Sequence, residues 1–288
     1  MDVKLLKENR VHGDFQFPFG YYSMKYDNPS QMLDCHWHDE FEFLLMTSGC
    51  AVFRVGDLKY DIAKGQALFI KSGEIHSAYS NKGSWGFSAI VFSPSLLNSN
   101  PYDKIQNKYI NEIIKKQSAY ATLISGSEQW EKELLEHLKI TIEIARKREY
   151  TYELLIKSHL YAIFSLILSN IKINTDISLM YKSDRLKPAI QYIQSNYKQK
   201  IYIDELSKMV HMSEGHFCRY FKKIVMKTPI EYLNHIRIIK ACELLKNSDR
   251  KVIDIAMDVG FSSFSYFINI FKRCMKLTPA KYRKEHQT

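Results

Sequence analysis

The chain has 288 residues, of which 45% are apolar, 13% aromatic and 25% charged, with a formal net charge of +10. This composition can bury a core, which excludes a disordered tail or a coiled-coil rod, and the length suggests about two domains. No apolar leader opens the sequence, no apolar run approaches the roughly 18 residues that span a bilayer, and the five cysteines form no Cys-x-x-Cys pair. We therefore expect a cytoplasmic protein with no membrane partner, disulfide framework or thiolate zinc site.

The positive charge is unevenly distributed along the chain. Residues 183–288 contain 20 Lys and Arg against 10 acidic residues, whereas residues 1–182 contain 21 of each. A neutral first part and a basic last part predict a sensing or catalytic domain joined to a domain that meets a polyanion. A merely solvated basic surface is the alternative.

The first elements in chain order are short β-strands. Between residues 15 and 92, runs rich in Phe, Tyr, Val and Ile, such as Phe41–Met46, Ala51–Val55 and Ala67–Ile70, are separated by turns that contain glycine. Strands broken every 8 to 12 residues or so predict a sandwich or barrel. Residues 128–148 and 152–171 then show helical periodicity, and the second helix is so apolar that its own barrel or a second subunit must cover it.

The β-rich region carries histidines at a regular spacing. His36, His38 and Glu42 follow one another as His-x-His-x-x-x-Glu, and His76 lies beyond a Lys-Ser-Gly turn. In a strand, His36 and His38 point to the same side, so both can face a barrel lumen that Glu42 and His76 reach from neighbouring strands. Three histidines and one carboxylate suit Zn, Fe, Mn or Ni. The spacing resembles the two motifs of the cupin barrel, except that Lys71 replaces the usual proline.

The last third of the sequence repeats itself. At a spacing of 50 residues the matching positions are Phe217 and Phe267, Phe221 and Phe271, Lys222 and Lys272, Thr228-Pro229 and Thr278-Pro279, and Tyr232 and Tyr282. Upstream of Phe217 the spacing is 49, so the second copy holds one extra residue near the start of its last helix. This regularity predicts a duplicated structural unit.

Each repeated unit is predicted to form two short helices joined by a tight turn. In the first unit, residues 203–210 precede Ser213, a natural cap for the next helix; in the second, residues 253–258 precede Ser262 or Ser263. This arrangement describes a helix-turn-helix, whose second helix enters the major groove. A long helix over residues 229–245 would connect the units and set both reading helices about one turn, roughly 34 Å, apart on B-DNA. By position, Lys222, Lys223, Lys272 and Arg273 could contact phosphates.

A specific residue pattern in the second unit adds to this interpretation. It consists of Ile253, Ala256, Val259, Gly260, Phe261, Tyr266, Phe267, Phe271, Lys272, Thr278, Pro279, Tyr282 and Arg283. The pattern resembles the signature of the AraC/XylS family of transcription regulators. The resemblance implies base-reading positions at Gly215, Cys218 and Arg219 in the first unit and at Phe264, Ser265 and Asn269 in the second.

Two features depart from the family pattern. Met226 and Lys276 stand where a helix-ending glycine is usual, which predicts that the two helix ends are closed differently. Asn269 stands where a basic residue is common, which weakens the expected contact of that half-site.

The predicted fold is α+β. Residues 1–100 form a cupin-like, ligand-sensing β-barrel, residues 101–173 a helical dimerisation and packing segment, residues 174–184 a linker, and residues 185–288 an all-α domain of two helix-turn-helix units joined by a long helix. The expected partners are double-stranded DNA operator half-sites, a small-molecule effector such as a sugar, a second copy of the chain and, by resemblance, RNA polymerase, with activation favoured over repression.

The ligand pocket is expected in the barrel. Its candidate residues are His36, Trp37, His38, Glu42, His76 and Trp85, the tryptophans as stacking faces for a sugar or simply as core. Sensor domains resembling this one often bind metabolites without a metal, so we expect no cofactor; if a divalent metal binds, His36, His38, Glu42 and His76 hold it. No phosphate loop, serine elbow or dinucleotide turn occurs, and no catalytic residue is expected. The alternative function is a cupin metalloenzyme, a dioxygenase or isomerase, fused to a DNA-binding tail.

Overall fold

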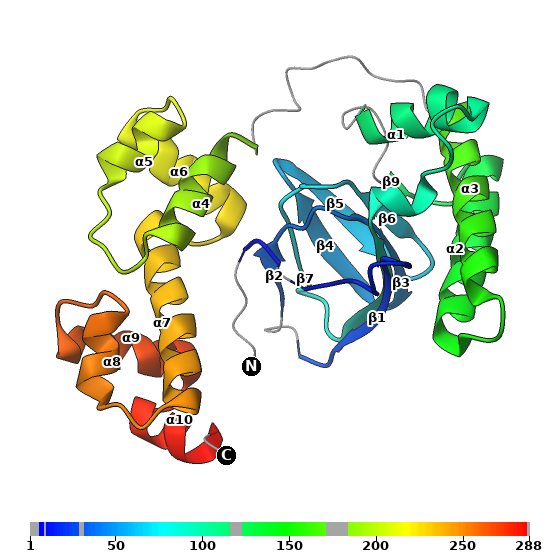
Figure 1. Cartoon of the computed structure of the whole chain (residues 1–288). Helices are drawn as coiled ribbons and strands as arrows, with labels where there is room; N and C mark the ends of the chain where they lie inside the picture. The colour runs from blue at the N-terminus through cyan, green and yellow to red at the C-terminus, as the bar shows by residue number, and fades with distance from the viewer. Residues whose placement is uncertain (1–5, 9, 29–31, 116–122, 171–183, 287–288) are drawn as a thin grey trace. The chain divides into compact units, whose positions relative to one another are not determined.

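A computed structural model describes residues 6–8, 10–28, 32–115, 123–170 and 184–286 (Figure 1). The chain divides into two units, residues 7–184 and residues 185–288. The linker expected at 174–184 lies outside the described residues except for its last position, Asp184. No helix among the described residues is long and apolar enough to cross a membrane.

The first unit is built around two antiparallel sheets. The strands are β1 (Phe19–Tyr26), β2 (Met32–His36), β3 (Phe41–Ser48), β4 (Cys50–Val55), β5 (Leu58–Ala63), β6 (Ala67–Ile70), β7 (His76–Tyr79), β8 (Trp85–Phe92) and β9 (Leu123–Ile124). One sheet has the order β1-β8-β3-β6-β9 and the other the order β2-β7-β4-β5. The strand pattern predicted a sandwich or barrel and the histidine spacing a cupin-like fold, and the two sheets confirm a cupin-like β-sandwich.

Strand β9 was not anticipated. It lies in the stretch assigned to helices, yet Ile124 pairs with Ala67 and Leu123 with Leu68 of β6. A strand of two residues is too short to show a period of two in the sequence. Short helical turns precede it: η1 (Pro94–Leu97), the π-helix η2 (Gln106–Ile110) and α1 (Asn111–Lys115).

Helices α2 (Gln129–Lys147) and α3 (Tyr152–Asn170) pack on one face of the five-stranded sheet. Phe164 of α3 lies 5.8 to 5.9 Å, between ring centroids, from Phe41, Phe43 and Phe69. Burying one such aromatic ring contributes about 1.5 to 3 kcal/mol. The sheet and α2 together therefore cover the buried side of α3, while Leu154 remains 70% exposed.

A second core lies between the sheets. Trp85 stacks on Tyr26 with ring centroids 4.2 Å apart, and Phe53 and Phe87 pack around it. Trp85 is fully buried and Trp37 is 2% exposed. Both tryptophans are thus enclosed by protein, and neither presents an open ring face to a ligand in this structure.

The DNA-binding unit, residues 185–288, is entirely helical, as predicted. Its elements are η3 (Asp184–Leu186), α4 (Lys187–Ser195), α5 (Ile203–Met209), α6 (Glu214–Val225), α7 (Pro229–Asn247), α8 (Val252–Asp258), α9 (Phe264–Met275) and α10 (Pro279–His286). The pairs α5–α6 and α8–α9 are the two helix-turn-helix units, and α7 runs between them (Figure 1). The extra residue of the second copy lies in the turn before α9, because α8 begins 49 residues after α5 and α9 begins 50 residues after α6.

The ends of α6 and α9 correct one expectation. Met226 and Lys276 adopt left-handed backbone conformations, with φ of 62° and 58°. Each cap N–H donates to the carbonyl four residues earlier, on Lys222 and Lys272 respectively. The helices are therefore closed in the conformation that glycine favours, although a non-glycine residue pays about 1 to 2 kcal/mol of strain there.

Candidate functional site

The candidate DNA-reading surface begins with α6. Its buried side is formed by Phe217 and Phe221, both fully buried. Because these rings fix which side faces the core, Gly215 and Arg219 fall on the opposite, exposed side, while Cys218 is half-buried. Two of the three positions expected to read bases in this unit are therefore accessible to a partner.

Helix α9 repeats this arrangement with different side chains. Phe267 and Phe271 are fully buried, and Ser265 and Asn269 are exposed. Phe264 is half-buried and stacks on Phe267 with ring centroids 6.3 Å apart. Its ring packs against the core at the start of the helix.

Exposed cations end both reading helices. All four residues expected to contact phosphates lie in the last turns of α6 and α9 and are solvent-exposed; they are Lys222, Lys223, Lys272 and Arg273. The sequence of α9 contains no acidic residue. The end of α9 can therefore neutralise phosphates without first breaking an ion pair within that helix.

Ser263, not Ser262, caps α9, since its hydroxyl accepts a hydrogen bond from the Tyr266 N–H at 3.3 Å. The Tyr266 hydroxyl in turn accepts from Asn234 of α7 at 2.9 Å. These bonds fix the start of α9, the part of the helix that would meet base edges.

Arg237 of α7 is the important residue whose role the sequence did not reveal. Its guanidinium donates hydrogen bonds to the backbone carbonyls of Tyr197 (2.8 Å) and Gln199 (2.9 Å) and lies over the Phe261 ring at 5.5 Å. Burial lowers the pKa of Arg237 from its usual value. This arginine joins the segment after α4 to the turn of the second helix-turn-helix.

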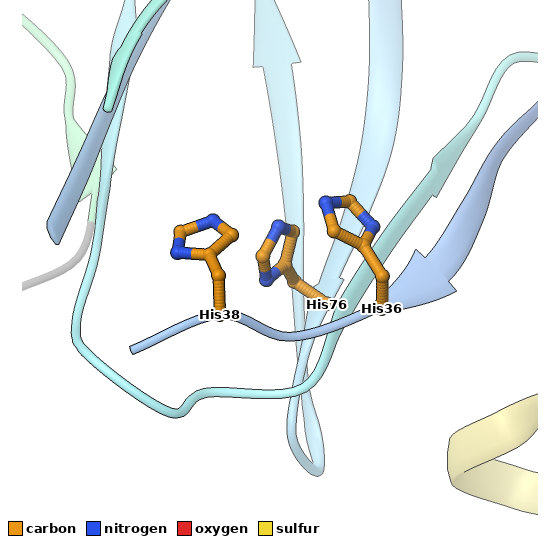
Figure 2. Close-up of side chains that lie close together, drawn as sticks. All are labelled: His36, His38 and His76. Carbon is orange, nitrogen blue, oxygen red and sulfur yellow. The ribbon is translucent and has the colours of Figure 1, made fainter. Parts of the chain in front are cut away.

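The second candidate site lies in the barrel, where three histidines converge. His36 ends β2 and pairs directly with His76 at the start of β7, with ring centroids 4.1 Å apart. Two bonds from the turn after β6 hold the His38 backbone region: Gly73 N–H donates to the His38 carbonyl and Ser72 Oγ donates to the Asp39 carbonyl, both at 2.7 Å. Figure 2 shows the three imidazole rings side by side, with His76 in the middle.

Glu42 of β3 reaches the same place from the other sheet. Its Oε2 lies 3.1 Å from His38 Nε2, with which it forms a hydrogen bond, and 3.3 Å from His76 Nε2. The His76 nitrogen is not aligned for a hydrogen bond, and it has no other partner among the described residues. His38, Glu42 and His76 are at most 5% exposed. The structure thus brings together all four residues predicted as possible metal ligands.

The electrostatics of this cluster follow from burial and mutual contact. Burial opposes the charged form of His38, but its hydrogen bond to Glu42 outweighs this, so the pKa of His38 is raised. Burial also opposes the Glu42 carboxylate, yet His38 and His76 hold the pKa of Glu42 below its usual range. Burial and the neighbouring His76 lower the pKa of His36.

The segment before β1 adds two residues that sequence reasoning missed. Glu8 N–H donates to the Trp37 carbonyl at 2.9 Å, and Glu8 Oε2 lies 3.8 Å from His36 Nε2. The His12 ring packs edge-on against His38, with centroids 5.7 Å apart, and hydrogen-bonds to the Tyr22 hydroxyl at 2.9 Å. No spacing rule links these residues to the histidine motif, because the contact is made by tertiary folding.

Comparisons with known proteins match two family models. Residues 25–163 match an AraC-like ligand binding domain, and residues 206–285 match a helix-turn-helix domain. The two matched regions contain the histidine cluster and both reading helices, respectively.

Several curated relatives match along most of their length. The chain is 30% identical to an uncharacterized HTH-type transcriptional regulator, YdeC, of Bacillus subtilis (strain 168), covering 97% of this chain and 96% of the relative. It is 23% identical to the HTH-type transcriptional activator RhaR of Mannheimia succiniciproducens, covering 86% of each chain. Among solved structures, ToxT of Vibrio cholerae covers 94% of this chain and 99% of its own at 18% identity, with a TM-score of 0.40, which is too low to support an inference.

Proposed function

Because the chain belongs to the AraC family of helix-turn-helix transcription regulators, we propose that it is a ligand-responsive activator that binds adjacent DNA half-sites. It is a DNA-binding regulator with a ligand-binding domain, and the family is not one of enzymes. The alternative of a cupin metalloenzyme with a DNA-binding tail is therefore set aside. Its place of action would be the cytoplasm, where the DNA is.

One observation carries the DNA-reading part of the proposal: the two reading helices bury and expose equivalent positions. Both bury two phenylalanines four residues apart and expose the opposite side, which ends in two cations. In a helix-turn-helix the exposed N-terminal half of the second helix meets base edges, and cations near it meet phosphates. Gly215, Arg219, Ser265 and Asn269 would read bases, with Cys218 and Phe264 contributing through their exposed edges.

Activation is supported by two relatives that are named as activators and match most of the chain, RhaR and RhaS of Mannheimia succiniciproducens. An activator would contact RNA polymerase. The effector would bind in the barrel, and α2 with α3 would pair two subunits through exposed positions such as Leu154. A carbohydrate effector has less support, because Trp37 and Trp85 are enclosed and offer no stacking face.

Selection from a random double-stranded DNA library with the full chain tests the proposal. We expect enrichment of two short conserved blocks about one helical turn apart. The Arg219→Ala chain should lose selectivity at one position of one block and keep the other block intact. Recovery of unenriched DNA by the unaltered chain would overturn the proposal.

A further inference from the structure

A histidine pair joins the two long helices of the first unit. The Nδ1 atoms of His137 on α2 and His159 on α3 lie 2.8 Å apart, and the ring centroids lie 5.1 Å apart. Both rings are half-buried, and the next residues along the chain, Leu138 and Leu160, are fully buried. The pair therefore lies at the rim of the apolar contact between the helices.

The short distance between the two nitrogens fixes how many protons lie between the rings. With no proton there, two lone pairs would face each other, and with two protons, two N–H groups would. One proton gives a hydrogen bond from one Nδ1 to the other. This bond forms when both rings are neutral, and also when the pair carries one extra proton. It is lost when both rings are charged, because each Nδ1 then carries a proton.

The titratable groups around the pair are engaged elsewhere or lie on other elements. Those within one turn of the pair are Glu133, Glu136 and Lys139 on α2 and Lys157 and Tyr161 on α3; on the helix-facing side of the sheet, β1 carries Tyr21 and Lys25, while β3 and β8 carry none, and η1 carries none. Glu133 accepts from Gln129 at 3.2 Å, and Glu136 accepts from Lys139 at 2.6 Å. Burial, together with the charge of His137, lowers the pKa of His159.

The strength of the contact between the rings therefore depends on pH. In the unfolded chain each ring takes up a proton at its usual pKa of about 6.5. In the folded chain, burial and the neighbouring ring oppose the second proton, so that the pKa of His159 is lowered. The contribution of the pair to folding is complete above about pH 6.5 and is lost as the pH falls, because the unfolded state then binds more protons.

The pair lies beside an exposed apolar surface. Ile140, one turn after His137, is 43% exposed, and Leu155, one turn before His159, is 45% exposed. Residues three or four positions apart lie on the same side of a helix. Each exposed side chain therefore shares a side of its helix with one histidine of the pair, and separation of the helices would move both side chains.

We propose that His137 and His159 form a pH-dependent link between α2 and α3, which holds with one proton between the rings and is lost when both rings are protonated. The link stands on the contact between the two rings. Its consequence, that acid weakens the pairing of two copies through Ile140 and Leu155, rests on the proposed function.

The link is tested by NMR of the full chain labelled with ¹⁵N-histidine. At neutral pH a scalar coupling between the two Nδ1 nuclei should report the hydrogen bond, and it should vanish when both rings are charged. The pair should take up its two protons in steps about one pH unit or more apart. In the His137→Gln chain, His159 should titrate in a single step. Absence of the coupling, or titration of His159 that is the same in both chains, would overturn the link.

The effect on the helices is measured by amide hydrogen exchange, expressed as protection relative to an unfolded peptide at the same pH. On mild acidification, protection of α2 and α3 should fall by about threefold or more. The chain with both His137→Gln and His159→Gln is the matched control, because two amides can keep a hydrogen bond but do not titrate. His216→Gln, at an exposed position of α6, should behave like the unaltered chain. Equal losses of protection in the unaltered and doubly substituted chains would contradict the link.

Sedimentation of the same chains tests the consequence for pairing. Self-association of the unaltered chain should weaken by about threefold or more on mild acidification and stay constant in the doubly substituted chain. Self-association that does not change with pH would overturn the consequence. Absence of self-association at every pH would overturn it together with the subunit pairing of the proposed function. In either case the coupling between the rings still decides the link, so the two proposals can fail separately.

Discussion

The two helix-turn-helix units reach the same backbone path with different residues. The turn of the first unit places His211 at a φ of 55°, and the turn of the second places Gly260 at 98°. At Gly260 a Cβ atom would lie 2.6 Å from the Lys198 carbonyl oxygen, which is closer than real contacts allow. Glycine is therefore required at position 260 both by the close approach of the Lys198 backbone and by the positive φ.

The exposed sides of the reading helices differ more than their cores. The core positions repeat as phenylalanines, but the exposed positions pair Arg219 with Asn269 and Gly215 with Ser265. The comparison teaches that the two copies share their packing and differ on the surface that we propose meets DNA. Substitutions can test each half of that statement.

The largest difference between the units is expected at the turn. Gly260→Ala should lower the free energy of unfolding of the second unit by about 3 kcal/mol, from left-handed strain plus the clash with the Lys198 backbone. His211→Ala, at the matching position, should change it by less than about 0.5 kcal/mol. Amide hydrogen exchange in α5 and α8 of the full chain measures both. Equal losses would show that the turns are equivalent after all.

The next largest difference is expected in sequence reading. Arg219→Ala should weaken binding to the selected DNA by about 1 to 3 kcal/mol and relax the choice of base at one position. Asn269→Arg should instead strengthen binding and steepen its salt dependence, because it adds a cation at a base-reading position of α9 that carries none. Lys208→Ala on α5, outside the reading helices, serves as the control in a fluorescence anisotropy titration. Unchanged affinity of the Arg219 variant for all sequences would contradict a reading role.

The helix ends should respond alike in both units. Met226→Gly and Lys276→Gly should each stabilise the chain by about 1 kcal/mol, because glycine adopts the left-handed conformation without strain. Met226→Ala keeps the strain and should bring no such gain. Thermal unfolding with a fixed heating rate compares the three variants, and destabilisation by either glycine would contradict the strain at that end.

The smallest effect is expected from single phosphate contacts. Lys222→Ala and Lys272→Ala should each reduce the slope of log affinity against log salt by about 0.9, on selected and random DNA alike. Arg237→Ala should leave the slope unchanged while destabilising the fold, since its guanidinium bonds to backbone carbonyls. A reduced slope in the Arg237 variant would reassign that residue to the DNA surface.

Much of this architecture was predictable from the sequence because it depends on local periodicity. The duplicated phenylalanines gave the buried sides of α6 and α9, and alternation with glycine turns gave β3, β4 and β6. The convergence of His36, His38, Glu42 and His76 was also predicted, but on the premise that His36 and His38 share a strand. Strand β2 ends at His36, and hydrogen bonds from the turn after β6 hold the His38 backbone instead.

What could not be predicted depends on contacts between distant segments. The pairing of β9 with β6, the approach of Glu8 to His36 and the bonds of Arg237 join residues far apart in the chain. The left-handed ends at Met226 and Lys276 show a second limit. There, both helices end in the conformation that glycine favours although neither residue is glycine.

The segment after α4 also affects how the units could be exchanged between proteins. The Lys198 backbone lies against Gly260, and the Lys198 side chain forms an ion pair with Asp258 at 3.6 Å. The carbonyls of Tyr197 and Gln199 accept hydrogen bonds from Arg237. Each of these partners belongs to a later part of the chain. The second helix-turn-helix is therefore not a separable module. A chimera that grafts residues 252–286 onto another scaffold must bring residues 196–200 with it.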